Sequence, residues 1–493
     1  MSDFSDKCRQ LIKESGTNVY QLSKEANLDR TTLQRCVTGK RLPGMEFVKK
    51  MCRYLKLSTM EEEELLILFK IEKLGKESYL NNKAIEQIIS NIRKFQKIYK
   101  NESFVGWKEK NEIYGSSYIN VHTETEVNSL IEYLIWQEIE SEDRPQIYME
   151  LTGTCKITLE KFLQYEKMTE KEIRVCHFLN FSKRGINAGK GSSNVDLLES
   201  VIPFAFSFDN VYKAYYTYIA EIRMDPNAVL WPYYIVTTNA VLLISASMER
   251  GLMIQDKVLA GHYREELRNM LKYYRVLFTP RKMNLTSIQY YLEEVMNDKT
   301  PDFILESHPC FNKVLFQSVV LSQNHTERKE ARVIEDCYLE MRRRLYEEGL
   351  PVSFFGTKEL KTFLKTGYFP GRWGEMCRQF SPEERKAIVE DFYNEVQETG
   401  WNQYCINEEK LPVGEGLYIE VYGSERVVFM STAKEHPFGI ICIEEKSICE
   451  AFNSYMKSLE NSGKVYDREQ SLRYLKDLCD ELGEKEKLPY KNI

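Results

Sequence analysis

The sequence has few of the residue patterns that support metal binding or disulfide chemistry. Its 6 histidines form no HxxxH or HExxH arrangement, and its 12 cysteines, scattered between Cys8 and Cys479, include no CxxC pair. Zinc sites and secreted disulfide frameworks depend on such closely spaced ligands. We therefore expect no metal and no cofactor, and we expect the cysteines to be reduced thiols, most of them in hydrophobic cores.

Long hydrophobic runs are also missing. No apolar stretch approaches the roughly 18 residues that a membrane-spanning helix needs. The opening residues, MSDFSDKCRQL, lack the basic-then-apolar order of a secretion signal. Scattered reduced thiols are typical of the cytoplasm, where a chain without a secretion signal stays. The sequence therefore predicts a cytoplasmic protein that has no membrane partner.

Familiar catalytic motifs are absent. There is no GxSxG, and no histidine begins the HxK(x)4D motif of phospholipase D. Residues 184–194, RGINAGKGSSN, fail the GxxxxGK[ST] spacing of a phosphate-binding loop, so a flexible loop is expected there. No motif predicts an enzyme, although a body of about four hundred residues leaves room for an unrecognised catalytic site.

Charge is distributed unevenly along the chain. Residues 1–58 carry 12 Lys and Arg against 6 Asp and Glu, whereas the whole chain has a net charge of −6. The remainder is therefore acidic. A small basic segment on an acidic body indicates that this segment is the part that meets a polyanion.

Apolar residues at helical spacing predict several short helices in this basic segment. Asn18 can cap one of them, with Gln21 three residues later completing a capping box. Asn27 stands where the chain must turn sharply, and Asp29 can cap the next helix. That helix ends at Gly39. Two short helices joined by a three-residue turn, inside a five-helix unit of about 70 residues, are typical of the helix-turn-helix.

The stretch QLSKEANLDRTTLQRCVTGKRLPGMEFVKKMCRYLKLS resembles the DNA-binding domains of the Cro/phage-repressor (XRE) family. The similarity spans roughly residues 5–70. It includes the Leu-x-x-x-Ala pair, the turn, the pattern of the third helix and the Gly-Lys-Arg-x-Pro ending. In that family the start of the third helix enters the major groove of DNA. The resemblance implies double-stranded DNA as the partner of residues 1–70.

Carried over position by position, the resemblance also implies the residues that contact DNA. The implied base contacts are Arg30, Thr31, Gln34 and Arg35, and the implied phosphate contacts are Asn18, Val19, Lys40 and Arg41. Two positions depart from the family pattern. Asn27 replaces the usual Gly, which is chemically compatible, and Asp29 replaces the common Ser or Thr. A carboxylate at that position caps well but adds negative charge near the DNA backbone.

The rest of the chain is predicted to be a helical connector followed by an α+β body. Apolar stripes predict the connector at 71–105, as packing helices or as a dimerisation element. Within the body, 235–267 and 420–456 share one order of strand, polar turn, apolar strand, glycine, apolar run and helix. Val241 then corresponds to Val427, an offset of 186 residues. This predicts an internal duplication, with one α+β domain at 106–300 and a second at 301–493; chance similarity of two generic hairpin-and-helix units is the alternative.

Together these features predict a multidomain, bacterial-type transcription regulator. We expect a homodimer whose body senses a small-molecule or protein effector, or serves for dimerisation, because paired domains create clefts that favour small molecules. Two alternatives remain open. The first is an enzyme or a defence or signalling protein that uses the head for targeting, and the second is a protein-interaction module.

Overall fold

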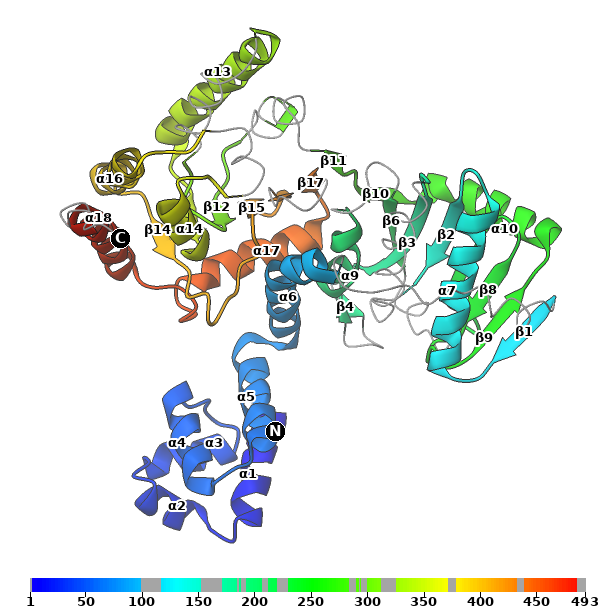
Figure 1. Cartoon of the computed structure of the whole chain (residues 1–493). Helices are drawn as coiled ribbons and strands as arrows, with labels where there is room; N and C mark the ends of the chain where they lie inside the picture. Colours follow the sequence, from blue (N-terminus) through cyan, green and yellow to red (C-terminus); the bar gives the residue numbers. More distant parts are fainter. Residues whose placement is uncertain are drawn as a thin grey trace, which may run out of the picture. The chain divides into compact units, whose positions relative to one another are not determined.

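The computed structural model describes residues 2–98, 117–151, 171–183, 186–187, 192–205, 212–219, 229–282, 290–291, 293, 299–311, 325–370, 378–431 and 439–485. The chain divides into two units, Met1–Lys83 and Ala84–Ile493 (Figure 1). Each unit has a hydrophobic core of its own.

Unit 1 consists of helices. They are α1 Asp3–Glu14, α2 Val19–Glu25, α3 Arg30–Val37, α4 Met45–Leu55, α5 Thr59–Leu74 and the first part of α6 Lys76–Ile98. The first and fifth helices are held together by an edge-on contact between Phe4 and Phe69, with ring centres 5.5 Å apart. Lys7 and Glu64 form an ion pair of 2.6 Å between the same two helices. The helical head predicted from the sequence is confirmed.

The predicted connector is helical as far as the structure describes it. Gly75, with φ of +84°, separates α5 from α6, and the boundary between the two units lies within α6. Ile85 and Ile89 on the second part of α6 belong to the core of unit 2. Residues 99–105 of the predicted connector lie outside the described residues.

Unit 2 contains two mixed β-sheets. The first has the strand order β1-β9-β8-β7-β2-β3-β6-β10. Its strands are β1 Tyr118–Val121, β2 Gln146–Glu150, β3 Arg174–Ser182, β6 Tyr212–Ile219, β7 Tyr233–Val236, β8 Val241–Ile244, β9 Gly251–Ile254 and β10 Arg275–Phe278. Helices α7 Glu124–Ser141, α9 Asn194–Ala205 and α10 Lys257–Met270 and the short η4 Leu271–Tyr273 belong to this half.

The second sheet has the strand order β11-β17-β16-β15-β12-β13-β14. Its strands are β11 Arg281–Lys282, β12 Phe303–Glu306, β13 Val352–Phe355, β14 Gln403–Cys405, β15 Leu417–Tyr422, β16 Arg426–Ser431 and β17 Gly439–Ile443. Its helices are α13 His325–Glu348, α14 Lys358–Thr366, α16 Pro382–Thr399, α17 Lys446–Leu459 and α18 Arg468–Lys485. Two sheets with helices between their strands confirm the α+β class of the body.

Six strands of each sheet follow the same plan. The order β9-β8-β7-β2-β3-β6 in the first sheet matches β17-β16-β15-β12-β13-β14 in the second. In both, the first three neighbouring pairs are antiparallel and the last two are parallel. In both, the strands also occur in the same order along the chain.

The agreement extends to side chains on the parallel strands. Phe178 of β3 stacks on Tyr215 of β6, with ring centres 6.0 Å apart and an interplanar angle of 25°. Phe354 of β13 stacks on Tyr404 of β14 in the same way, at 5.6 Å and 25°. The two pairs occupy equivalent places because each bridges the last two strands of its parallel set.

The helix that follows each antiparallel meander covers the same face of its sheet. Val241 of β8 lies in a core cluster with Ala260 and Leu267 of α10. On the second sheet, Phe429 of β16 contacts Phe452 of α17 edge-on at 5.4 Å. Val427, two residues before Phe429 on β16, therefore lies on the same side of its sheet as Val241 does on the first. The 186-residue offset in the sequence aligns the same two residues.

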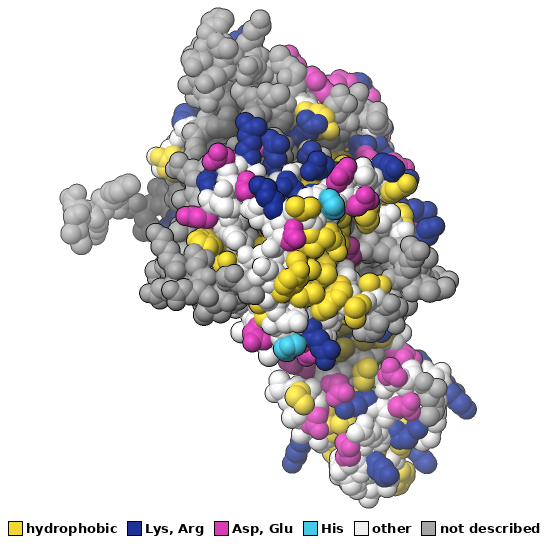
Figure 2. All heavy atoms as spheres, turned by 90° about the vertical axis from the view of Figure 1, so that its right-hand side faces the viewer, with side chains coloured by type: hydrophobic (Ala, Val, Ile, Leu, Met, Phe, Trp, Pro, Cys, Tyr) yellow, Lys and Arg dark blue, Asp and Glu magenta, His cyan; other side chains and the backbone are white. Residues whose placement is uncertain are grey.

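One end of the first sheet keeps apolar side chains accessible. Ile254 pairs with both Val241 and Tyr118, so all three point to the face that α10 covers at β7 and β8. Ile254 is half-buried and Tyr118 is 67% exposed. Figure 2 views this side of the molecule and shows hydrophobic side chains gathered into one patch, with Lys and Arg side chains clustered beside it.

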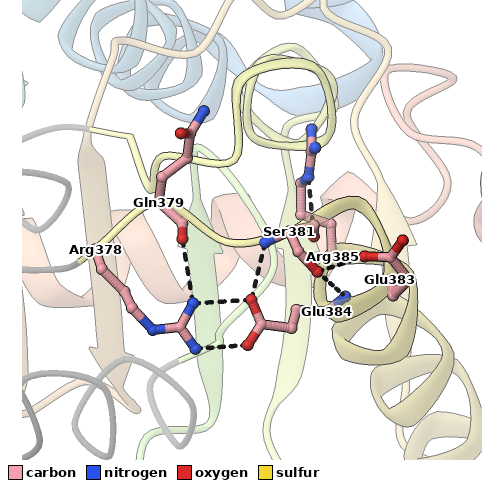
Figure 3. Close-up of polar contacts among 6 residues, drawn as sticks. All are labelled: Arg378, Gln379, Ser381, Glu383, Glu384 and Arg385. Atoms are coloured by element: carbon pink, nitrogen blue, oxygen red, sulfur yellow. Dashed lines mark hydrogen bonds and ion pairs between the residues drawn. The ribbon is translucent and has the colours of Figure 1, made fainter.

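A capping box starts α16. The Ser381 N–H donates to the Glu384 carboxylate at 2.8 Å, and the Glu384 N–H donates to the Ser381 hydroxyl at 3.2 Å (Figure 3). Both terminal nitrogens of Arg378 donate to the same carboxylate, at 2.9 and 2.5 Å. These bonds satisfy N–H groups that have no partner within the helix and fix where α16 begins.

Three further predictions concerned a membrane span, a metal site and the loop at 184–194. No helix in the described ranges is long and apolar enough to cross a membrane, and the described residues hold no group of three or more His, Cys, Asp and Glu side chains that could bind a metal ion. Part of the loop predicted at 184–194 forms a small ladder, in which β4 Ile186–Asn187 pairs with β5 Ser192–Ser193. Residues 184–185 and 188–191 of that loop lie outside the described residues.

Candidate nucleic-acid interface

The start of α2 is fixed by its first residues. Asn18 is the N-cap: its side-chain oxygen accepts from the Gln21 N–H at 3.0 Å, and its amide nitrogen donates to the Gln21 side chain at 2.9 Å. The predicted N-cap is present, but the Gln21 side chain bonds the Asn18 side chain and not its backbone N–H, so the predicted capping box is not completed. Val19 is the first helical residue, so its N–H has no acceptor within the helix. An exposed Asn18 and this N–H together offer donors to an anion at the positive end of α2.

A left-handed residue makes the turn between α2 and α3. Asn27 has φ of +51°, a conformation that Asn tolerates better than most side chains. The next residue, Leu28, is buried, and its N–H donates to the Ser23 carbonyl at 2.9 Å. Asn27 therefore takes the role for which the family pattern usually has Gly.

Asp29 caps α3. Its carboxylate accepts from the Thr32 N–H at 2.7 Å. Hydrogen bonds from the Thr32 hydroxyl and N–H hold the pKa of Asp29 below its ordinary value, and the positive charge of Arg41 lowers it further. Asp29, which departs from the family pattern, thus remains a charged carboxylate at neutral pH. It is exposed, as are the residues of α3 predicted to contact DNA.

The exposed side of α3 brings together the four predicted base contacts. Leu33, Cys36 and Val37 are buried and turn the opposite side of the helix toward the core. Arg30, Thr31, Gln34 and Arg35 are all exposed. Their spacing of i, i+1, i+4 and i+5 places them on a single helical face. This face carries two positive charges and two polar groups, the side-chain types that read base edges in the major groove.

The end of α3 positions the two predicted phosphate contacts that follow it. Gly39 has φ of +70°, and its N–H donates to the Cys36 carbonyl at 3.0 Å. The Lys40 N–H donates to the Arg35 carbonyl at 2.8 Å. This pair of bonds is a Schellman motif, which confirms Gly39 as the residue that terminates the helix. Lys40 and Arg41 are exposed immediately beyond it.

One residue of this surface was missed from the sequence. Tyr20, the second residue of α2, is 56% exposed, and the Arg30 guanidinium lies over its ring at 5.1 Å. The contact brings the start of α2 beside the start of α3, so the predicted phosphate contacts at Asn18 and Val19 adjoin the predicted base contacts. The signal for this residue was an exposed aromatic side chain, Tyr20, directly after Val19, whose N–H has no acceptor within the helix.

Comparison with known families identifies this region. Residues 9–61 match the helix-turn-helix family, a span that includes α2, α3 and α4. The match confirms the resemblance of the N-terminal domain to Cro/phage-repressor helix-turn-helix domains. At the level of protein class it supports a DNA-binding regulator. It covers a small part of the 493 residues and does not extend into the body.

Solved structures show faint likeness to the whole chain. TrmBL2, an archaeal chromatin protein, is 10% identical with a TM-score of 0.22, over 52% of this chain and 98% of that chain. Polyphosphate kinase from Porphyromonas gingivalis is 11% identical with a TM-score of 0.22, over 78% of this chain and 57% of that chain. Neither likeness is close enough to carry an argument. No curated protein sequence matches the chain.

Proposed function

We propose that the chain is a cytoplasmic, sequence-specific transcription regulator whose residues 1–70 bind double-stranded DNA. The observation that carries this proposal is the exposed face of α3, where Arg30, Thr31, Gln34 and Arg35 lie together beside the start of α2. Helix-turn-helix domains insert the second helix of the motif into the major groove and let the first cross the backbone. Here α3 and α2 take those two positions.

Each side chain on this face has a base-edge partner that suits its chemistry. The guanidinium groups of Arg30 and Arg35 match O6 and N7 of guanine, and the amide of Gln34 matches N6 and N7 of adenine. The methyl group of Thr31 suits the methyl group of thymine. These contacts determine which sequence the head prefers.

A second set of groups binds phosphates, and these contacts do not depend on the base sequence. Asn18 and the Val19 N–H offer hydrogen bonds and the positive end of the α2 dipole to one phosphate. Lys40 and Arg41, held just beyond α3, supply point charges to another. Phosphate contacts set the register of the head on the duplex, and they make its affinity depend on salt.

A single head of this size buries too little surface for tight specific binding, so we include a homodimer in the proposal. Two heads related by a twofold axis bind a pseudo-palindromic operator with half-sites about 10 base pairs apart, one helical turn of DNA. The body supplies the remaining role, which is sensing an effector or holding the dimer together.

The body is, in this proposal, a duplicated domain, with halves at 106–300 and 301–493. The shared strand order of the two sheets supports it, as do the matching pairs Phe178–Tyr215 and Phe354–Tyr404. A chance likeness of two hairpin-and-helix units does not require six strands with the same pairing directions. Two related halves also place a junction between them where a ligand can bind.

The proposal is tested by selecting duplexes from a randomised library with the full chain. We expect enrichment of one inverted repeat with half-sites about 10 base pairs apart. The double variant Arg30→Ala, Arg35→Ala is the matched control, because both side chains are exposed and their loss spares the core of the head. Enrichment of the same sequence by this variant, or no enrichment by the natural chain, contradicts the proposal.

A further inference from the structure

A cavity lies where the chain passes from the first sheet of the body to the second. Strand β10 ends at Phe278 and β11 begins at Arg281, so the residues between them cross directly from one sheet to the other (Figure 1). The cavity has a volume of about 490 Å³. Its wall on one side comes from β10 and Tyr216 of β6, and on the other from β17 and the two residues after it. A volume in the range of roughly 300–1,000 Å³ is typical of small-molecule sites.

Two arginines in this wall lack an acidic partner. Arg275, on β10, and Arg281, on β11, are both exposed, and no ion pair among the described residues involves either of them. The guanidinium of Arg281 lies 3.7 Å from the centre of the Tyr290 ring, which also lines the cavity. An arginine stacked on an aromatic ring keeps its charge and its planar donors available to a third group.

The acidic residues of the same wall are already neutralised or bonded. Glu444 forms an ion pair of 3.3 Å with Arg426. Glu445 is 2% exposed and caps α17, accepting from the Ile448 N–H at 2.9 Å and from the Ser447 hydroxyl at 2.7 Å. The tyrosine Tyr218 donates to the other oxygen of the same carboxylate. With Glu444 paired to Arg426 and Glu445 bonded only to neutral donors, the lining holds two arginines against one carboxylate, so its net charge is positive.

The thiol in the wall does not suit covalent chemistry. Cys442, on β17, also lines the cavity. Burial raises the pKa of its thiol to about 11, so the thiol is protonated at neutral pH and is a weak nucleophile. The cavity therefore has the character of a binding site.

We propose that this cavity binds a small organic anion that carries a phosphate or carboxylate group. Guanidinium groups bind both through paired, charge-assisted hydrogen bonds. An anion held by Arg275 and Arg281 together contacts both sheets, since the two residues belong to different sheets. That this anion is the effector of a regulator rests on the proposed function. That the cavity binds the anion does not depend on it.

Binding is tested on the full chain without DNA, by calorimetric titration with ATP, adenosine, pyrophosphate and citrate. We expect at least one of the three anions to bind and adenosine, which has no anionic group, to bind much more weakly. Pyrophosphate binding together with citrate failure assigns a phosphate site, and the reverse assigns a carboxylate site. Failure of all three anions, or adenosine binding as tightly as ATP, overturns the proposal.

Variants locate the binding. Arg275→Ala and Arg281→Ala each weaken the anion that binds by about ten- to a hundredfold, since each removes a charge-assisted contact. Arg250→Ala, which removes an exposed charge from the turn before β9, is the matched control and leaves affinity unchanged. Thermal unfolding shows that each variant is folded. Unchanged affinity in the double variant Arg275→Ala, Arg281→Ala overturns the proposal.

A parallel titration with an operator duplex separates this inference from the proposed function. Anion binding that depends on Arg275 and Arg281 supports the cavity site even in a chain that binds no duplex. A chain that binds its operator but no anion retains its function as a regulator and loses the cavity site.

Discussion

The Arg30 guanidinium at the start of α3 lies over the ring of Tyr20 in α2, 5.1 Å from its centre. The contact joins the two helices of the motif at the surface we propose for DNA. It also restricts the long side chain of Arg30 before any base is met, which lowers the entropy that binding must remove.

Substitution of Tyr20 tests that role. Tyr20→Leu is expected to weaken operator binding about two- to fivefold, because an exposed cation–π contact contributes about 0.5–1 kcal/mol. Tyr20→Phe, which keeps the ring, is the matched control and should bind as the natural chain does. Anisotropy titration measures both. Equal affinity of the Leu and Phe variants would show that the ring does not position Arg30.

Asp29 is expected to limit the affinity of the head. Asp29→Ser keeps a good N-cap for α3 and removes a negative charge near the DNA backbone, so operator binding should tighten, most clearly at low salt. Asp29→Asn, which caps as well and is neutral, should tighten binding equally. Weaker binding by both variants, with unchanged thermal stability, would mean that the carboxylate makes a favourable contact with DNA.

His177 should make the stability of the body depend on pH. It is fully buried, its Nδ1 lies 2.7 Å from the Tyr212 hydroxyl, and burial lowers its pKa to about 4. The unfolded chain takes up this proton near pH 6.5, while the folded chain does not until about pH 4. Stability contributed by the neutral imidazole is therefore present above pH 6.5 and falls, by up to about 3 kcal/mol, as the pH drops toward 4.

Urea unfolding followed by tryptophan fluorescence measures that dependence. His177→Phe cannot take up the proton, so its unfolding free energy should change less between pH 7 and pH 4.5 than that of the natural chain. The variant is less stable at neutral pH because it removes the buried hydrogen bond between His177 and the Tyr212 hydroxyl. The slope with pH, and not the stability at one pH, is the test; parallel slopes would rule out His177 as the cause.

The start of α16 gives a second pH-dependent prediction, in which the charged form of a side chain is the stabilising one. Hydrogen bonds from Arg378, followed by that from the Ser381 N–H, lower the pKa of Glu384 to about 2 (Figure 3). A carboxylate with a lowered pKa stabilises the fold above its ordinary pKa, near 4.5, and this stabilisation is lost as the pH falls toward 2. The Glu384 and Arg378 side chains are 39% and 60% exposed, so solvent limits the ion pair to about 0.2–1 kcal/mol.

Glu384→Gln separates the ion pair from the cap. Glutamine still completes a capping box, so the variant loses the charge alone. We expect its thermal midpoint to lie below that of the natural chain at pH 6 and to approach it as the pH falls from 4.5 toward 2. A constant difference across this range would show that the carboxylate acts through the cap and not through its charge.

Local chemistry made the head predictable from its sequence. Asn18, Asp29 and Gly39 each act on backbone groups within a few residues of themselves, so their roles as caps follow from residue type and spacing. The cavity between the sheets was not predictable, because it depends on β10 and β11, which pair with strands distant in the sequence. The contact of Tyr20 with Arg30 was missed because it depends on the angle between two helices.

In the body, too, some features follow from local sequence and others depend on contacts between distant parts of the chain. The α+β class of the body was predicted from local pattern. The order of the strands within each sheet was not, since parallel neighbours such as β12 and β13 are joined by long connections that contain helices. The sequence similarity of 235–267 and 420–456 predicts a duplication and carries no information on the order of the strands.

Titration of the selected operator with the full chain, from 50 to 200 mM salt, tests the central claim most directly. The account predicts that affinity falls steeply with salt. Arg35→Ala should lose preference for the operator over unrelated duplex, while Lys40→Ala should weaken both alike and reduce the slope of log affinity against log salt by about one. Affinity that does not change with salt, or preference for the operator that survives Arg35→Ala together with Arg30→Ala, would contradict it.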